Sequence, residues 1–183
     1  MADTGIGASV RRKEDFRFLT GRGTYTDDIN RPNQAYAHFL RSPHAHAKIK
    51  SIDLAAARKA PGVVTILTGA DIAADKVGGL ICGWVVKDKQ GNPHKAPAHP
   101  PLAKDTVRYV GDHVAVVIAE SVAQARDAAE LIKVDYQVLP AVIELARALD
   151  PGAAQIHAEA PKNLCFDWEL DRKSTRLNSS HRL

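Results

Sequence analysis

The chain has 183 residues, of which 45% are hydrophobic and 25% are charged, a composition typical of a globular protein with a real core and not of a fibrous or disordered one. No stretch approaches the roughly 18 apolar residues of a membrane helix, and the first residues lack the basic start and apolar run of a secretion signal, so we expect a cytoplasmic protein. The formal net charge is +4, but four cations and one carboxylate in residues 171–183 contribute +3 of it, which argues against a nucleic-acid surface on the rest of the chain.

Two strands are predicted between residues 35 and 51. Residues 35–40 are short and mostly apolar, and the turn-forming residues Arg41, Ser42 and Pro43 follow them. From residue 44 to residue 51 polar and apolar side chains alternate, which is typical of a half-buried strand. The turn would therefore join two strands.

Residues 53–71 predict two short helices around one strand. Asp53 can cap a helical turn over residues 54–57, and the β-branched run of residues 63–67 is typical of an inner strand. Thr68 and Asp71 have the spacing of a capping box, which indicates that a further short helix begins there.

Residues 78–101 contain many glycines and prolines and are predicted to form a long excursion. The set consists of Gly78, Gly79, Gly83, Gly91, Pro93, Pro97, Pro100 and Pro101. Loops of this length in compact domains are usually functional or mobile. We expect this one to cover or contact something outside the domain.

Residues 114–138 predict strand, helix and strand. The apolar run 114–119 suits a strand buried on both faces, and Ser121 with Gln124 forms a capping-box pattern. An apolar stripe follows at helical spacing, made of Val122, Ala125, Ala129 and Ile132, and residues 134–138 alternate again. This order predicts an α/β (α+β) fold with a mixed sheet and a right-handed βαβ unit.

The end of the chain predicts a linker and a foreign tail. Residues 144–149 suggest a helical turn, and residues 151–170 are typical of an extended connection between domains. Residues 171–181 have no hydrophobic period, and codons that would encode them resemble a common sequencing adapter. We therefore expect residues 171–183 to be non-native and the natural gene to continue past Leu170.

Two histidine pairs are candidate metal ligands. His44 and His46 share one face of the predicted strand, but Lys48 and Lys50 continue that face and would repel a cation, so a solvated face is the favoured interpretation. His94 and His99 lie in the proline-rich excursion with Cys82 upstream. No third ligand there has diagnostic spacing.

The remaining candidates fail a test of context. Gly21 and Gly23 neither follow a convincing strand nor open a convincing helix, so a turn is favoured over a phosphate cradle. Asp27 and Asp28 could be paired carboxylates, but adjacent residues on a strand face opposite ways, and their neighbours are turn-like. Cys82 and Cys165 are far apart and lack CxxC spacing, so neither a disulfide framework nor a zinc ribbon is indicated.

Several ordered segments resemble the N-terminal part of one enzyme family. They are RFLTGRGTYTDD (17–28), RSPHAHAKI (41–49), APGVV (60–64), LTGAD (67–71), VRYVG (107–111), VAVVIA (114–119), AAEL (128–131), VDY (134–136) and LP (139–140). The family comprises the molybdenum-binding large subunits of xanthine dehydrogenase, aldehyde oxidase and carbon monoxide dehydrogenase.

The resemblance implies an α/β hammerhead domain over residues 16–150, after an N-terminal arm (1–15) and before a linker (151–170) toward a missing molybdopterin-binding domain. For the complete protein it implies an oxidoreductase with a molybdenum–pterin centre and a small-molecule substrate, and with 2Fe-2S clusters and FAD on partner subunits or neighbouring domains. The family's cofactor contacts and its base lie further downstream. No catalytic, cofactor-binding or metal residue is therefore assigned to this chain.

The matched positions are instead predicted to determine the fold. They are Gly21, Gly23, Asp27, Asp28, Arg41, Ser42, Pro43, His44 and Gly111. Two other functions stay open at this stage: a non-catalytic assembly or binding module, and a metal-dependent enzyme that uses His94 and His99.

Overall fold

The structure is a computed structural model that describes residues 6–7, 9 and 12–167. The chain divides into two compact units, residues 1–34 and residues 35–183. The first unit contains helix α1 (Asp15–Leu19) and a 3₁₀ helix, Thr26–Asp28. The predicted tail, residues 171–183, lies outside the described residues, as do residues 168–170 and parts of the predicted arm. The domain boundaries stay predictions.

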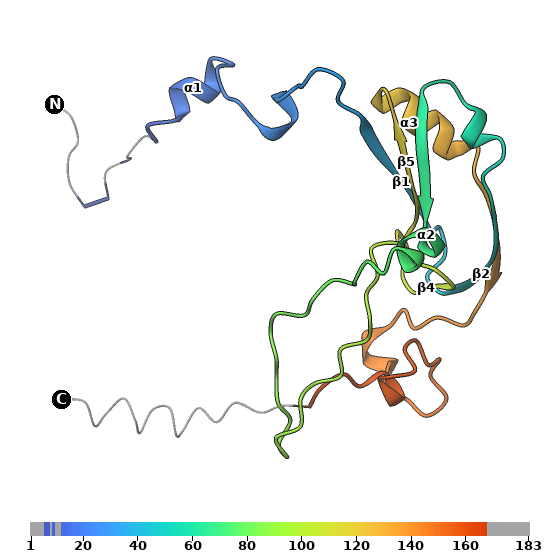
Figure 1. Ribbon diagram of the computed structural model, residues 1–183. Coiled ribbons are helices and arrows are strands. Elements are labelled where there is room, and N and C mark those ends of the chain that lie inside the picture. Colours follow the sequence, from blue (N-terminus) through green and yellow to red (C-terminus); the bar gives the residue numbers. More distant parts are fainter. Residues whose placement is uncertain (1–5, 8, 10–11, 168–183) are drawn as a thin grey trace. The chain divides into compact units, whose positions relative to one another are not determined.

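One sheet of the second unit is built around the most apolar strand. Its strands lie in the order β1 (Tyr36–Arg41), β5 (His113–Ala119) and β3 (Val63–Thr68), and all are antiparallel (Figure 1). Ala115, Val117 and Ala119 of β5 are fully buried toward helix α3, while Val114 packs into a second cluster. The apolar run of β5 is thus buried on both faces, as predicted.

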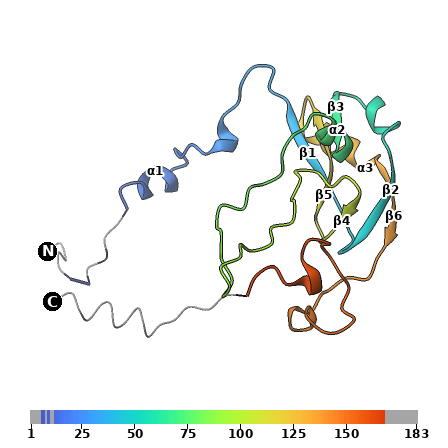
Figure 2. The same cartoon turned by 60° about the horizontal axis from the view of Figure 1, so that its bottom comes forward.

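The second sheet is smaller. Its strands lie in the order β4 (Thr106–Val107), β2 (Ala47–Asp53) and β6 (Lys133–Val138), again antiparallel, as the turned view shows for β2 and β6 (Figure 2). A bulge lies between Ile49 and Ser51. Ile52 and Val134 pack against both apolar clusters, so the two sheets share one core.

The mixed α/β class is confirmed, but the predicted mixed sheet and βαβ unit are wrong. β5 and β6 flank helix α3 (Val122–Glu130) in sequence, yet they belong to different sheets. Each pairs antiparallel with an earlier strand, β5 with β1 and β3, and β6 with β2. Strand β3, predicted as an inner strand, lies at an edge.

Helix α3 begins and packs largely as its sequence predicts. The Ser121 hydroxyl accepts the Gln124 N–H at 3.3 Å and donates to the Gln124 side chain at 2.9 Å. Small residues face β1 and β5, with Ala125, Ala128 and Ala129 buried, which allows close approach of helix and sheet. Val122 was placed on this stripe wrongly, since it occupies the first turn and is mostly exposed.

The second predicted capping box is also present. Helix α2 (Gly69–Ala74) follows Thr68, whose N–H and hydroxyl both donate to the Asp71 carboxylate at 2.7 Å. Asp53 accepts the Ala55 N–H at 2.9 Å, but the turn it caps continues as a 3₁₀ helix, Ala57–Lys59.

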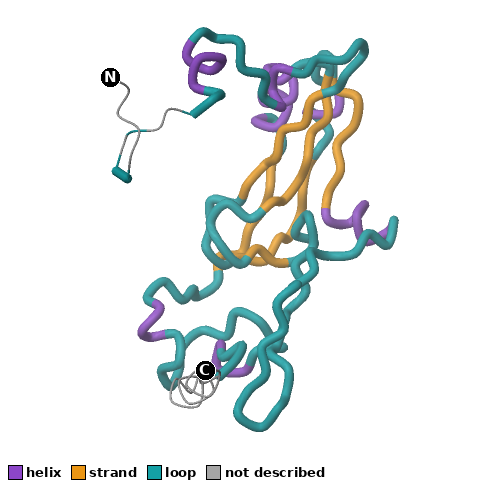
Figure 3. The backbone as a smooth tube through the Cα atoms, turned by 90° about the vertical axis from the view of Figure 1, so that its left-hand side faces the viewer, coloured by secondary structure: helices purple, strands orange, loops and turns teal. Residues whose placement is uncertain are grey.

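Two long irregular segments extend beyond the sheets (Figure 3). The excursion of residues 78–101 carries an isolated bridge between Lys87 and Pro93. The other segment, residues 139–167, contains 3₁₀ helices Leu145–Arg147 and Pro161–Asn163. The Lys95 N–H donates to the Cys165 carbonyl at 2.9 Å, so the two segments are tied together.

Candidate functional site

The end of β1 and the start of β5 meet at three of the motif residues. The Ser42 N–H donates to the Asp112 carbonyl and the Gly111 N–H donates to the Ser42 carbonyl, both at 2.8 Å. Gly111 has φ +91°, a conformation that favours glycine, and its carbonyl accepts from Arg41 Nη1 at 3.3 Å. The structure therefore brings Arg41, Ser42 and Gly111 together, although they are 70 residues apart in sequence.

The turn after Arg41 is fixed by its own side chains. The Ser42 hydroxyl accepts the His44 N–H and donates to the His44 carbonyl, both at 3.0 Å. The His44 ring packs edge-on against Tyr136 of β6, with ring centres 5.0 Å apart. Pro43 lies exposed within the turn. This turn links the two sheets, and the fold-determining role of its residues stays a prediction.

In the first unit the glycines and carboxylates have local structural contacts. Gly21 has φ +70°, as a turn requires, but Gly23 does not; a Cβ there would lie 2.7 Å from Cδ1 of Phe18. Asp27 and Asp28 are both exposed, and the Asp28 carboxylate accepts the Tyr25 N–H at 2.9 Å and caps the 3₁₀ helix. These contacts favour the structural interpretation of Asp28 over a paired-carboxylate site.

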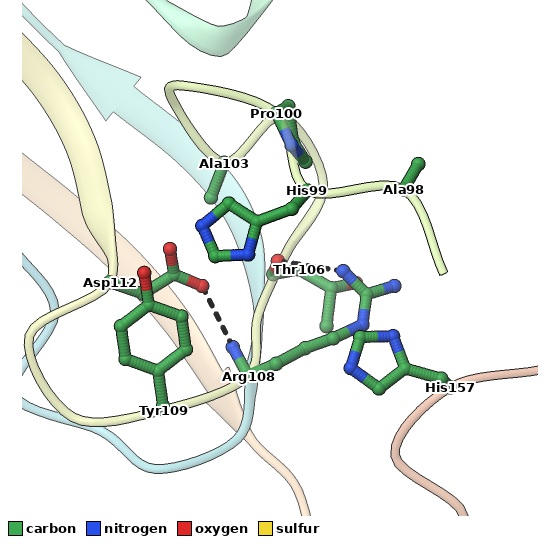
Figure 4. Close-up of a pocket in the computed structure, with 9 residues that line it drawn as sticks. All are labelled: Ala98, His99, Pro100, Ala103, Thr106, Arg108, Tyr109, Asp112 and His157. Carbon is green, nitrogen blue, oxygen red and sulfur yellow. Dashed lines mark hydrogen bonds between the residues drawn. The ribbon is translucent and has the colours of Figure 1, made fainter. Parts of the chain in front are cut away.

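A hollow of about 190 Å³ lies beside the Ser42–Gly111 junction (Figure 4). Its lining consists of Ala98, His99, Pro100, Ala103, Thr106, Arg108, Tyr109, Asp112 and His157. The Arg108 guanidinium donates from Nε to the Ile156 carbonyl at 3.2 Å and from Nη1 to the Thr106 carbonyl at 3.4 Å. Residue 157 is therefore held against the strand region by Arg108.

Charge and burial shift the pKa of two lining groups. Burial raises the pKa of Tyr109, and the neighbouring Asp112 carboxylate raises it further. Burial lowers the pKa of His157, and the Arg108 guanidinium lowers it further because a second positive charge nearby is unfavourable. The buried Asp112 carboxylate accepts the Arg108 backbone N–H at 3.0 Å. Acidic and basic groups thus occupy different ends of one hollow.

The histidine pair before β2 does not form a strand face with the two lysines. The strand begins at Ala47, after both histidines. His46 is buried and its Nδ1 donates to the Pro140 carbonyl at 2.7 Å. Of the four residues, Lys48 and Lys50 are exposed and His44 is partly exposed. The solvated-face interpretation of His46 was wrong because its partner lies 94 residues away in sequence.

His94 and His99 line one shallow hollow with Cys82, but they are not arranged as metal ligands. His94 Nδ1 accepts the Val86 N–H at 3.1 Å, so the proton of the neutral ring is on Nε2, which is buried. His99 stacks on Tyr109, with ring centres 6.0 Å apart. Among the described residues no group of three His, Cys, Asp or Glu is placed to hold a metal.

Sequence reasoning missed Arg108, Asp112 and His157 as lining residues of one hollow. The motif VRYVG contains Arg108, but nothing local to it indicates contact with residue 156, which is 48 positions later. One signal was present: the predicted linker contains polar residues that a free connection does not need. Asn163, for example, donates to the carbonyls of Ala148 and Ala154 and accepts the Ile156 N–H.

Comparison with known proteins identifies the family to which this chain belongs. The family model of the aldehyde oxidase and xanthine dehydrogenase a/b hammerhead domain matches residues 20–140. The chain is 41% identical to the nicotine 6-hydroxylase large subunit of Paenarthrobacter nicotinovorans, over 87% of this chain and 19% of that protein. It is 34% identical to the carbon monoxide dehydrogenase large chain of Afipia carboxidovorans, over 92% of this chain and 21% of that protein.

A solved structure agrees. The crystal structure of quinoline 2-oxidoreductase from Pseudomonas putida 86 superposes with a TM-score of 0.69 at 44% identity, over 82% of this chain and 18% of that one. The chain spans about a fifth of the length of the curated relatives it matches. In the part of the chain that the structure describes, no helix has the length and hydropathy to cross a membrane. The chain belongs to the aldehyde oxidase and xanthine dehydrogenase family and carries its a/b hammerhead domain.

Proposed function

We propose that this chain is the hammerhead part of the large subunit of a molybdenum hydroxylase, a cytoplasmic oxidoreductase. The observation that carries the proposal is the family match over residues 20–140, supported by 41% identity to a large subunit over 87% of the chain. The complete subunit would bind molybdopterin. Electrons would leave through 2Fe-2S clusters and FAD on partner subunits or neighbouring domains.

The 183 residues themselves are proposed to be inactive. Their relatives are about five times as long, and a full active site would need the further polypeptide. These residues supply a pair of sheets and two long segments with exposed apolar side chains, including Leu80, Ile81 and Trp84. Such surface is typical of a face that packs against other protein.

For the substrate we propose a nitrogen heterocycle. Two of the relatives with the higher identities are named for nicotine (41%) and quinoline (44%), whereas the carbon monoxide dehydrogenase large chain is 34% identical. Hydroxylation of a ring carbon with water inserts one oxygen and releases two protons and two electrons. The electrons must pass to an acceptor, which fits an enzyme with redox partners.

The test begins with genomic DNA beyond codon 170. We expect an open reading frame that continues in place of residues 171–183. Its product, expressed with the neighbouring genes, should contain molybdenum by elemental analysis and should reduce an artificial dye with quinoline or nicotine but not with carbon monoxide. The 183-residue chain is the control and should contain no molybdenum.

Two results would contradict this proposal. A native stop codon directly after codon 170 would favour the free-standing binding module instead. Turnover by the 183-residue chain alone would show that its residues hold a complete active site.

A further inference from the structure

The hollow beside Arg108 contains a guanidinium that forms no direct ion pair with a carboxylate of the described residues. Arg108 is half-buried, and the carboxylates near it include Asp112 in the same hollow and Glu159 in an adjoining one that Arg108 and His157 also line. The recorded partners of the guanidinium are two neutral main-chain carbonyls, those of Ile156 and Thr106. A partly buried charge without a directly bound counter-charge is unfavourable, so this guanidinium is a candidate site for an anion.

The two carbonyls also orient the group. They fix one Nε and one Nη1 donor, while a guanidinium has five N–H donors in one plane. Three of the five donors are not engaged by these carbonyls, and paired guanidinium N–H donors match the two oxygens of a carboxylate. Figure 4 shows the guanidinium end of Arg108 next to His157 and on the opposite side of His99 from Asp112.

The rest of the lining limits the size of the occupant and can accommodate a flat group. The His99 and Tyr109 rings stack at an interplanar angle of 24° and form an aromatic wall. The volume of about 190 Å³ is below the range of about 300 to 1,000 Å³ typical of sites for drug-sized ligands, so one ring with a substituent is the upper size. Asp112 closes the other end with a negative charge and would direct an anion toward Arg108 and His157.

We propose that this hollow, the Arg108 pocket, binds a carboxylate group on a scaffold no larger than one ring, with the Arg108 guanidinium as its main partner. The carboxylate has two possible sources: a free small molecule, or an Asp or Glu side chain of further polypeptide. Binding needs no molybdenum. The proposal is therefore independent of the proposed function, and each can fail alone.

The experiment uses the ¹⁵N-labelled 183-residue chain at pH 7, titrated with sodium benzoate against sodium chloride at equal ionic strength. We expect saturable shifts of the amide signals of residues 106–112 and of the ring signals of His99 and His157. Benzamide has the same shape without the charge and should give no saturable shift. Burial, Arg108, His46 and His99 lower the pKa of His157, and Glu159 raises it. A bound anion offsets the effect of the positive neighbours, so benzoate should also raise the pKa of His157.

Two variants separate a specific site from general charge. Arg108→Lys keeps the charge but loses the fork, and it should weaken benzoate binding about tenfold, the loss expected for one charge-assisted hydrogen bond. Lys48→Met removes an exposed cation of β2 and should leave benzoate binding unchanged. The same titration on the longer gene product identifies the source: binding retained there indicates a free molecule, and binding lost there indicates a carboxylate of the protein.

Three results would overturn the proposal. They are equal binding of benzamide and benzoate, the absence of a saturable shift in a chain whose amide spectrum is dispersed, and equal weakening by Arg108→Lys and Lys48→Met. If the 183-residue chain gives no dispersed spectrum, the longer product is titrated with the same two ligands and its Arg108→Lys variant, and the same outcomes decide.

Discussion

The β5–α3 layer and the excursion of residues 78–101 differ in what covers their apolar side chains. Val114, Ala115 and Val117 of β5 are 0% exposed, covered by α3, neighbouring strands and the second cluster. In the excursion Leu80 is 70% and Ile81 93% exposed. The first region is complete within this chain, whereas the second has the surface of a region that further protein covers. The comparison agrees with the proposal that the natural polypeptide is longer.

The largest difference in stability is expected when the same charged residue, an aspartate, is placed in the β5–α3 layer and in the excursion. Val117→Asp buries a carboxylate between α3 and the sheet and should destabilise the chain by more than about 4 kcal/mol. Val85→Asp, at a residue 62% exposed in the excursion, should change the free energy of unfolding by less than about 0.5 kcal/mol. Urea denaturation followed by circular dichroism measures both.

Equal urea midpoints for Val117→Asp and Val85→Asp would contradict the proposed difference between the two regions. A large effect of Val85→Asp would mean that the excursion packs within this chain. A small effect of Val117→Asp would mean that the β5–α3 layer is not formed.

What sequence predicted well in this molecule is local. The capping boxes at Thr68 and Ser121 each involve residues three positions apart, and the apolar run of β5 suffices to predict a strand buried on both faces. These features depend on short-range geometry that the sequence order itself displays.

What sequence could not predict depends on contacts between distant residues. The assignment of β5 and β6 to different sheets follows from pairing with β1 and β2, and nothing in residues 114–138 reveals that choice. The burial of His46 depends on Pro140, and the Arg108 pocket depends on residues 156 and 157. A single-residue pattern carries no information about partners 48 or 94 positions away.

A second test concerns the segment 139–167, which is intermediate between the buried β5–α3 layer and the exposed excursion. The Asn163 side chain makes hydrogen bonds of 2.9 to 3.0 Å to Ala148, Ala154 and Ile156. Asn163→Ala removes all three and should destabilise this segment locally by about 2 to 3 kcal/mol, since each contributes about 1 kcal/mol. Amide hydrogen exchange should speed up over residues 148–163 while β5 remains protected.

Asn33 provides the matched control. It has the same left-handed backbone, with φ 59° against 58°, but no side-chain hydrogen bond within the described residues. Asn33→Ala therefore measures the cost of alanine in that conformation alone. If both variants had the same effect, the three hydrogen bonds of Asn163 would contribute nothing and the segment would resemble the excursion.

A smaller effect on stability is expected at the start of α2, where the capping box joins residues only three positions apart. Asp71→Asn weakens the contacts with the Thr68 N–H and hydroxyl and should cost about 1 kcal/mol. Those hydrogen bonds lower the pKa of Asp71 below its ordinary 3.8, so its contribution is present above pH 3.8 and is lost as the pH falls through the lowered value.

The difference between Asp71→Asn and the native chain in thermal unfolding should therefore shrink at low pH. Asp75→Asn, at the other end of the same helix, lacks those two contacts and is the control. If the difference in thermal stability between Asp71→Asn and the native chain stayed constant from neutral to acidic pH, the ionised Asp71 carboxylate would not be what stabilises the start of α2.

The smallest effect is expected on the exposed face of α3. Arg126 and Glu130 lie one turn apart with Nε and Oε1 at 3.8 Å, and their side chains are 69% and 72% exposed. Solvent and salt screen such a pair, so Arg126→Ala should cost less than about 0.5 kcal/mol, and a double-mutant cycle with Glu130→Ala should give a coupling of similar size that falls at high salt. A coupling above about 1 kcal/mol would exceed what exposed pairs give. Such a value would mean that contacts from outside the helix hold the two side chains in place. The outer face of α3 would then resemble the excursion, which further protein is proposed to cover, and not the rest of the β5–α3 layer.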